Sequence, residues 1–265
     1  MSDIGTMQPW IFCPKPNAAA RLRLVCVPYA GAGASVYREW PEFLGDQVEL
    51  CALQLPGREN RLREPPFTCL RQAVEEVAKV LHSYQDLPIA LFGHSMGAVV
   101  CFELARKLRS QHLTPVHLFV SGRRSPQYPD RRPRLTPLPN ESFVAEICRR
   151  YNGIPREVLQ EPELMELLLP TLRADVEMLE TYDYQPGLPF EFPITAFGGL
   201  HDHETPLDEL RGWKDQTSAR FESNVVPGDH FFLRSAATEI LAIIRRELDS
   251  AAASLLSRQD PARLE

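Results

Sequence analysis

The stretch "LFGHSMGA" (residues 91–98) places two glycines and a serine directly after a run of apolar residues. The apolar run is continuous rather than alternating, which is typical of a strand buried on both faces of a parallel sheet. The residues that follow, "AVVCFELARKLRS", repeat apolar side chains at helical spacing. We therefore expect a strand, a sharp turn that carries Ser95, and a helix. That arrangement holds a nucleophilic serine out at the carboxyl end of a sheet.

The pattern Gly-X-Ser-X-Gly carries little weight alone, and its place between a strand and a helix makes it informative. A serine in so sharp a turn has close backbone contacts on both sides. Gly93 and Gly97 are the small residues that leave room for those contacts. A buried serine that caps the helix is the alternative interpretation.

The rest of the chain repeats the alternation of strands and helices. Further apolar runs predict strands at residues 22–29, 48–55, 89–93, 116–122, 192–199 and 221–228. Amphipathic helices are predicted between them, over residues 70–84 and 97–110. Such alternation predicts an α/β fold, with a mostly parallel central sheet and helices on both faces.

A long segment without strands interrupts this order. From Arg124 to Pro193 no strand-like run occurs, and about 70 residues is far longer than a usual connection. Helical patterns cover residues 141–151 and 161–182, and Pro170 is expected to kink or split the second helix. We expect a single domain over 1–265 with a helical lid subdomain inserted at about 137–184. A closing helix and a frayed tail from residue 257 complete the prediction.

The composition of the chain indicates which kinds of binding partner and which cellular compartment are expected. A chain of 265 residues with 44% hydrophobic side chains can bury one sizeable core. Its net charge of -6 argues against nucleic acid and anionic membranes as partners. The six scattered cysteines favour reduced thiols in a cytoplasm. No secretory signal or membrane-spanning run is recognisable, so we expect a cytoplasmic monomer whose mature chain starts near residue 1.

A serine hydroxyl needs a base beside it before it attacks a carbonyl. Of the seven histidines, His230 in "VVPGDHFFL" is the best placed, because it follows the last predicted strand. Asp202 in "FGGLHDHETP" follows the preceding strand and would orient the imidazole. The order serine, acid, histidine is that of α/β-hydrolases. Four other carboxylates compete for the place of the acid: Asp175, Glu204, Asp208 and Asp229.

The tetrahedral oxyanion of such a reaction needs two backbone N–H donors. We expect one from Met96, directly after the serine, and one from Ala30 in the loop "VPYAGAGAS". A plain connector between strand and helix is the alternative for that loop. It is not a dinucleotide site, because Val36 stands where the third glycine would be needed. No cofactor is expected, and no metal either, because the "HDH" triplet at 201–203 lacks further zinc ligands.

Several motifs occur together in the order typical of one family. They are "VPYAGAGAS", "LQLPGRENR" (53–61), "LFGHSMGA", "FVSGRRSP" (119–126), "FGG" with Asp202, and "GDHFFL". From about Leu22 to about Leu248 the chain resembles the type II thioesterases that accompany polyketide synthases and nonribosomal peptide synthetases. Two positions depart from the usual pattern: Tyr29 replaces a histidine, and Leu200 replaces an acidic residue.

The resemblance implies an α/β-hydrolase fold with Ser95, Asp202 and His230 as the triad. It also implies that the N–H groups of Ala30 and Met96 form the oxyanion hole, and that the lid covers an acyl channel. The implied activity is editing, in which stalled or wrong acyl groups are removed from the phosphopantetheine arm of acyl or peptidyl carrier proteins. The alternatives are a carboxylesterase or lipase acting on free esters, and a noncatalytic module that binds carrier proteins.

An arginine-rich segment, "SGRRSPQYPDRRPRL" (121–135), opens the insertion in a chain that is otherwise net acidic. Carrier proteins are acidic beside the phosphopantetheine serine, so these arginines could steer a carrier to the channel mouth. A solvated charged loop without a partner is the alternative.

Overall fold

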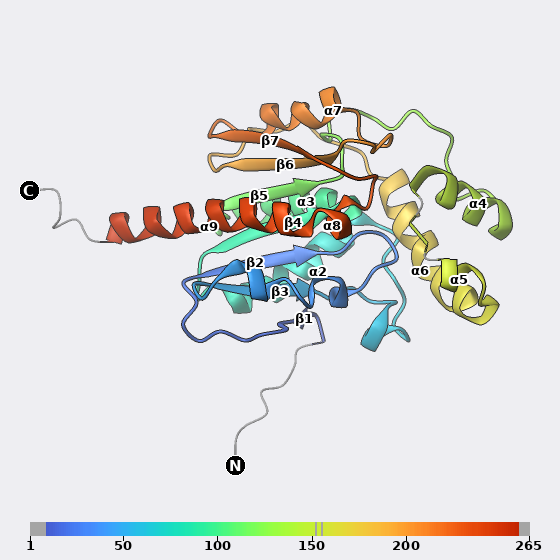
Figure 1. The fold of residues 1–265 in the computed structure, drawn as a ribbon, viewed down its shortest axis with the longest axis horizontal. Helices are drawn as coiled ribbons and strands as arrows, with labels where there is room; N and C mark the ends of the chain where they lie inside the picture. The colour runs from blue at the N-terminus through green and yellow to red at the C-terminus, as the bar shows by residue number, and fades with distance from the viewer. Residues whose placement is uncertain (1–8, 152, 155, 260–265) are drawn as a thin grey trace, which may run out of the picture.

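The computed structural model describes residues 9–151, 153–154 and 156–259. Seven strands form one sheet in the order β1-β3-β2-β4-β5-β6-β7 (Figure 1). The strands are Ile11–Phe12 (β1), Leu22–Val27 (β2), Val48–Leu53 (β3), Ile89–His94 (β4), His117–Ser121 (β5), Ile194–Gly199 (β6) and Phe221–Val226 (β7). Neighbouring strands pair in parallel, except that β1 runs antiparallel to β3. The mostly parallel sheet confirms the predicted fold class.

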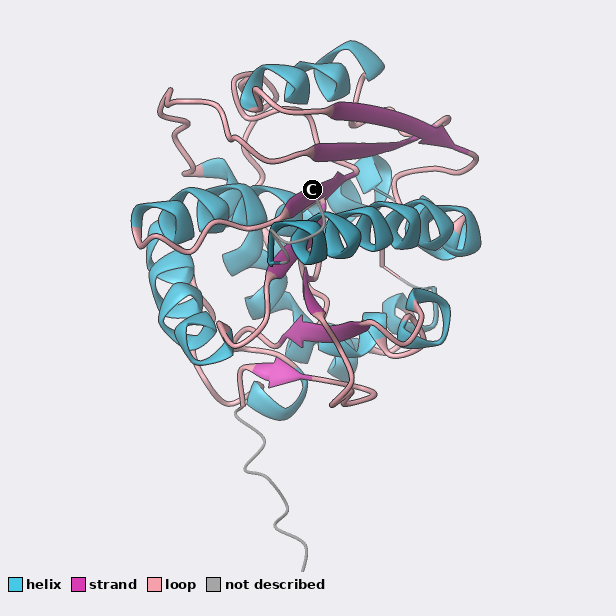
Figure 2. Cartoon of the chain, turned by 90° about the vertical axis from the view of Figure 1, so that its left-hand side faces the viewer, coloured by secondary structure: helices cyan, strands magenta, loops and turns pink. Residues whose placement is uncertain are grey.

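Helices cover both faces of this sheet (Figure 2). They are Pro41–Leu44 (α1), Leu70–Leu81 (α2), Met96–Ser110 (α3), Asn140–Tyr151 (α4), Arg156–Leu159 (α5), Pro162–Glu180 (α6), Leu207–Arg211 (α7), Phe232–Ser235 (α8) and Ala237–Gln259 (α9). Side chains of α2 and α3 bury one face of the sheet, and side chains of α1, α8 and α9 bury the other. Strand β2 shows why its apolar run is continuous: Leu24 faces one core and Val25 the other.

The order of the strands brings two connections to one place. Strand β2 lies between β3 and β4, so the chain leaves β2 and β4 at adjacent positions of the same sheet edge. In parallel sheets, binding sites form at the carboxyl ends of the strands where the strand order reverses. The turn with Ser95 and the loop with Ala30 therefore lie side by side at that edge.

Three predictions about the elements need correction. Strand β1 was not predicted, because two residues give no measurable period. The second helix of the insertion is not split, since α6 runs through Pro170 from Pro162 to Glu180. The predicted tail from residue 257 is wrong for residues 257–259, which continue α9, and residues 260–265 lie outside the described part.

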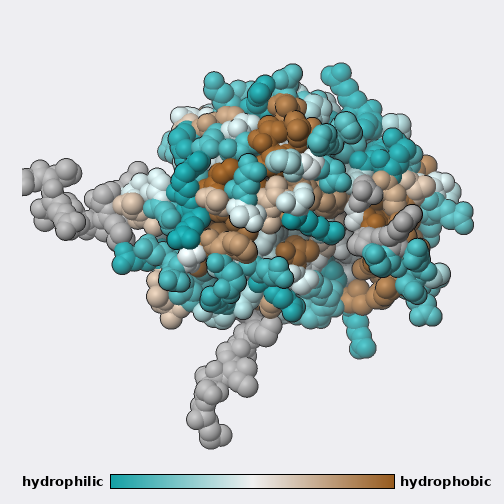
Figure 3. Space-filling view, in the orientation of Figure 1, coloured by the Kyte–Doolittle hydropathy of each residue, from teal (hydrophilic) through white to brown (hydrophobic). Residues whose placement is uncertain are grey.

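The three helices α4, α5 and α6, here called the helical insertion, leave the chain between β5 and β6. They have their own small core, to which α4 contributes Phe143 and Ile147, and α6 contributes Leu172 and Val176. All buried residues of α6 lie between Thr171 and Met178, in its second half. The first half exposes leucines, and apolar patches mark this side of the molecule at the right of Figure 3.

The sequence predicts reduced thiols and no membrane-spanning segment. All six cysteines are free thiols, and the Cys13 and Cys51 sulfurs lie 3.0 Å apart between β1 and β3. Among the described residues, no helix has both the length and the apolar character needed to cross a bilayer.

Candidate active site

The turn between β4 and α3 has the strained geometry that its glycines predict. Ser95 has φ 54° and ψ -111°, a conformation that is costly for a residue with a Cβ atom. Its backbone N–H donates a 2.8 Å hydrogen bond to the Ser121 carbonyl, which ties the turn to β5. A Cβ at Gly93 would lie 2.0 Å from the Gly97 carbonyl oxygen, and one at Gly97 would lie 2.2 Å from the Val27 carbonyl oxygen. Both glycines are therefore required by the close approach of the backbone.

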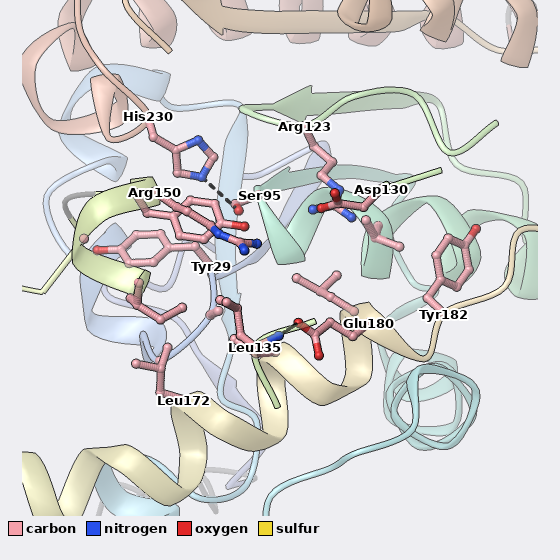
Figure 4. A pocket seen from close by; sticks show the side chains of 18 of the residues that line it. Tyr29, Ser95, Arg123, Asp130, Leu135, Arg150, Leu172, Glu180, Tyr182 and His230 are labelled. Atoms are coloured by element: carbon pink, nitrogen blue, oxygen red, sulfur yellow. Dashed lines mark hydrogen bonds between the residues drawn. The ribbon is translucent and has the colours of Figure 1, made fainter. Parts of the chain in front are cut away.

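The structure brings the predicted serine, histidine and aspartate together. His230 Nε2 lies 3.0 Å from Ser95 Oγ, and His230 Nδ1 lies 3.0 Å from Asp202 Oδ2 (Figure 4 shows the first contact). All three residues are buried. The second carboxylate oxygen of Asp202 accepts a hydrogen bond from the Glu204 N–H, 2.9 Å long, which fixes the carboxylate plane. This linear arrangement is the one that serine hydrolases use to activate a hydroxyl.

The competing carboxylates are all engaged elsewhere. Their partners are Arg58 for Asp175, Arg132 for Glu204, Arg211 for Asp208 and the Phe231 N–H for Asp229. The geometry therefore favours Asp202 as the acid. The flanking His201 and His203 are exposed, and among the described residues no set of three potential metal-ligating side chains gathers.

Two backbone N–H groups lie where an oxyanion hole is expected. Ala30 follows β2 and lines the same pocket as Ser95, and within the described residues its N–H forms no hydrogen bond. Met96 is the first residue of α3, where backbone N–H groups have no partner inside the helix and the helix dipole favours negative charge. The next N–H along the first loop, that of Gly31, is already used by Asp175 Oδ2 at 2.7 Å.

A second histidine, His94, is fully buried beneath the turn, and its side chain forms no hydrogen bond with the Ser95 hydroxyl. Its Nδ1 is 2.9 Å from Ser121 Oγ, and its Nε2 has no partner within the described residues. Burial, and to a smaller extent the nearby His230, lowers the pKa of His94 from 6.5 to about 3. His94 is therefore neutral at physiological pH and serves as packing for the site.

The triad opens into a pocket of about 600 Å³ between the sheet edge and the helical insertion (Figure 4). Leu135, Ile147, Leu172 and Val176 form an apolar wall. The other lining is strongly charged: six arginines and three acidic side chains. Part of the arginine-rich segment thus faces the pocket, whereas Arg131 is exposed and lies outside it.

A buried ionic network that sequence reasoning missed links α6 to the site. Arg58 donates to both carboxylate oxygens of Asp175, at 2.9 and 2.8 Å, and both side chains are almost fully buried. Asp175 also accepts the Gly31 N–H, and the Thr171 hydroxyl donates to the Gly57 carbonyl. In the sequence, the signal for this network was Arg58 in the motif "LQLPGRENR", and its partner Asp175 lies 117 residues away.

The two departures from the family pattern leave the triad intact. Tyr29 packs edge-on against His94 and Phe231, and its hydroxyl accepts a 2.8 Å hydrogen bond from Arg234. Leu200 is exposed at 62% and contributes nothing to the pocket. The carboxylate of Asp202 keeps its place without the second acid.

Residues 22–248 match the family model described as "Thioesterase domain". The chain belongs to the thioesterase family. It is 45% identical over 249 residues to the gramicidin S biosynthesis protein GrsT of Aneurinibacillus migulanus, which covers 94% of this chain and 97% of the relative. This thioesterase also resembles solved structures of the family.

Two of these solved structures are similar to this chain over most of their length. The type II thioesterase BorB of the borrelidin biosynthetic cluster has a TM-score of 0.83 and 34% identity, covering 90% of this chain and 97% of that one. The RedJ thioesterase of the prodiginine pathway in Streptomyces coelicolor has a TM-score of 0.82 and 38% identity, covering 88% and 93%. The fold and the reaction class of the chain are thus those of a thioesterase with an α/β-hydrolase fold.

Proposed function

We propose that this thioesterase hydrolyses acyl thioesters on the phosphopantetheine arm of acyl or peptidyl carrier proteins, as an editing enzyme of polyketide or nonribosomal peptide biosynthesis. The observation that carries the proposal is the hydrogen-bonded series from Ser95 through His230 to Asp202 at the end of an acyl-sized pocket. Relatives named for gramicidin S, borrelidin and prodiginine biosynthesis support the biosynthetic role.

In the proposed acylation step, Ser95 Oγ attacks the thioester carbonyl carbon while His230 Nε2 takes the hydroxyl proton. Asp202 holds the Nδ1–H and stabilises the imidazolium that forms. The N–H groups of Ala30 and Met96 stabilise the oxyanion of the tetrahedral intermediate. The carbon–sulfur bond then breaks, and His230 returns its proton to the departing pantetheine sulfur. A thiol has a pKa of about 8.5, so this leaving group needs less acid help than an amine.

Deacylation repeats these steps with water in place of serine. His230 removes a proton from water as its oxygen attacks the acyl-serine carbonyl, and the same N–H groups stabilise the second oxyanion. Collapse of the intermediate breaks the ester bond, returns the proton to Ser95 Oγ and releases a carboxylic acid. In this proposal the helical insertion is the lid that shields the acyl group within the pocket.

Mass spectrometry on a panel of acyl carrier proteins tests the proposal directly. Purified protein is expected to convert acyl-phosphopantetheine to the free thiol, and Ser95→Ala protein is expected not to. A faster reaction with free oxygen esters than with carrier-bound thioesters would instead favour a carboxylesterase. Failure of Ser95 to react with a fluorophosphonate, together with carrier binding, would favour a noncatalytic module.

A further inference from the structure

Arg123 lies on the neighbouring strand end, next to the proposed nucleophile. It follows β5 by two residues, and the Ser95 N–H bonds the last residue of that strand, Ser121. Adjacent strands are spaced by about 4.8 Å, so the backbones of the two strand ends lie side by side. Between them, Gly122 has φ 58° and its Cα packs so close to His94 that a Cβ would lie 2.6 Å from the imidazole.

The backbone of Arg123 is held in place, whereas its guanidinium is not. The buried Trp213 donates a 2.8 Å hydrogen bond from Nε1 to the Arg123 carbonyl. The side chain projects into the pocket that Ser95 and His230 also line (Figure 4). An arginine with a fixed backbone and a cavity-facing head group is suited to bind a ligand.

Within the described residues, the Arg123 guanidinium makes no hydrogen bond and no ion pair. Figure 4 shows Asp130 beside it, but both oxygens of that carboxylate are taken by Arg132, at 2.8 and 2.5 Å. Burial lowers the pKa of Arg123, whereas the nearby Tyr151 and Asp130 act in the opposite direction. A partly buried guanidinium without a hydrogen-bond partner is unfavourable in a folded protein, which makes an absent partner of negative charge the simplest explanation.

Four of the other five arginines of the pocket have partners among the described residues, and the three acids of the pocket accept hydrogen bonds from other groups. Arg124 pairs with Glu209, Arg150 with Glu146, and Arg234 with the Tyr29 hydroxyl. Glu180 accepts hydrogen bonds from the backbone N–H groups of residues 135 and 136. Arg134 also lacks a partner within the described residues, but it is exposed. Arg123 is thus the unpaired cation on the partly buried wall.

We propose that Arg123 is an anion-binding subsite of the acyl pocket, which selects thioesters whose acyl group ends in a carboxylate. A guanidinium fork matches a carboxylate through two parallel hydrogen bonds. The inference rests on the proposed function, because it assigns a substrate class to the same pocket. The phosphodiester of the pantetheine arm offers the same chemistry, so the experiment must separate the two sources.

The test compares two acyl thioesters of N-acetylcysteamine, which has no phosphate. One carries a glutaryl group, and the other carries the neutral glutaramoyl group of nearly the same shape. Wild-type protein is expected to prefer the glutaryl thioester in kcat/KM. Arg123→Gln should lower that preference about ten- to hundredfold, mainly through KM, as the loss of a hydrogen bond to a charged group does. Arg123→Lys should restore part of it.

Arg63→Gln is the matched control. Arg63 is exposed, lies outside the pocket and has no ion-pair partner within the described residues, so its replacement removes the same charge without touching the subsite. The preference for the glutaryl thioester should be unchanged in this variant. Circular dichroism and the unfolding midpoint of Arg123→Gln establish that any effect is not a loss of fold.

Binding of glutarate by Ser95→Ala protein, measured by calorimetry, supplies a readout that needs no hydrolysis. Glutarate should bind more tightly than glutaramide, its neutral diamide, and the difference should shrink strongly when Arg123→Gln is added. If no thioester is hydrolysed but this difference is present, the proposed function fails and the subsite stands. If Arg123→Gln lowers kcat/KM equally for the glutaryl and glutaramoyl thioesters, or changes it for neither, the proposal of the subsite is overturned.

A comparison of acyl-pantetheine with acyl-phosphopantetheine completes the test. When the acyl group is neutral, Arg123→Gln should change kcat/KM for acyl-pantetheine and for acyl-phosphopantetheine by the same factor. A loss confined to the phosphorylated substrate would assign Arg123 to the phosphodiester and overturn the acyl subsite.

Discussion

A hydrogen bond joins Ser95 Oγ to His230 Nε2, and the proposed reaction requires both side chains. Ser95→Ala should lower kcat by several orders of magnitude, because it removes the hydroxyl that His230 Nε2 contacts. His230→Ala should cost about as much, and the double variant little more than either, because the two groups act as a unit. Steady-state hydrolysis of a carrier-bound thioester measures all three variants. Retention of most activity in a folded Ser95→Ala protein would contradict the triad.

The acid is tested by two substitutions, one at Asp202 in the loop after β6 and one at Asp208 in α7. Asp202→Asn should lower kcat strongly, because an amide favours the wrong tautomer of His230, and the loss can reach about 10⁴-fold. Asp208→Asn should have little effect, because its side chain is 97% exposed and meets only Arg211. Kinetics of the two variants under identical conditions give the comparison. A larger loss in Asp208→Asn would show that the acid is misassigned.

The role of a single residue could be predicted from the sequence when that residue directly follows a recognisable strand. Ser95, Asp202 and His230 each follow an apolar run, and parallel strands bring such positions to one edge. No local pattern indicates the ion pair between Arg58 and Asp175, because it joins the loop after β3 to α6, 117 residues later in the chain. Asp175 was noticed only as a competing acid. Its ion pair depends on how the insertion packs, which no local pattern encodes.

At the scale of elements, the buried network of Arg58 and Asp175 fastens α6 to the first loop of the site. Asp175→Ala should destabilise the protein by about 3–5 kcal/mol, because it leaves the Arg58 guanidinium buried without a partner. The Gly31 N–H loses its acceptor in the same variant. Urea unfolding measures the change, with Asp208→Ala as the exposed control. A loss below about 1 kcal/mol would mean that the network is not a main source of stability.

The helical insertion should exchange its amide protons unevenly. The first half of α6 contributes no buried side chain, and α5 has four residues, so both should exchange much faster than β4. The second half of α6, from Thr171, should be protected by its buried network. Hydrogen exchange followed by mass spectrometry resolves these segments. Protection of residues 156–169 equal to that of β4 would exclude a lid that opens.

Elements with several buried residues were predictable from the chain alone, and marginal ones were not. The continuous runs of β2 to β6 carry their own signal because both faces are buried. Strand β1 exists only because β3 offers it an edge. Pro170 does not split the helix, because α6 runs from Pro162 to Glu180 and tolerates a single missing hydrogen bond; a kink at this position stays a prediction.

For the whole molecule, two buried histidines predict loss of stability in acid. Burial lowers the pKa of both His94 and His117 from 6.5 to about 3. The folded state therefore resists protonation that the unfolded chain accepts, so stability is fully present above pH 6.5 and is lost as pH falls toward 3. At pH 5.5 each histidine should cost about 1.4 kcal/mol relative to pH 7.5.

Urea unfolding at the two pH values measures this loss. His117→Gln is the informative variant, because His117 lies at the start of β5, away from the triad, and bonds Thr195. It should be less stable than the wild type at pH 7.5 but lose about 1.4 kcal/mol less on acidification. An unchanged pH dependence would show that His117 does not contribute.

The charge of the pocket lining has a consequence for the end of each catalytic cycle. Thioester hydrolysis turns a neutral thioester carbonyl into a carboxylate, so every turnover adds one negative charge inside a wall of six arginines and three acids. The acid product carries one negative charge more than the acyl group that entered, so the pocket wall attracts it more strongly, and we expect its release to be a slow step. Added salt weakens that attraction where solvent reaches it, so turnover at saturating substrate should rise with ionic strength even as capture of an acidic carrier weakens.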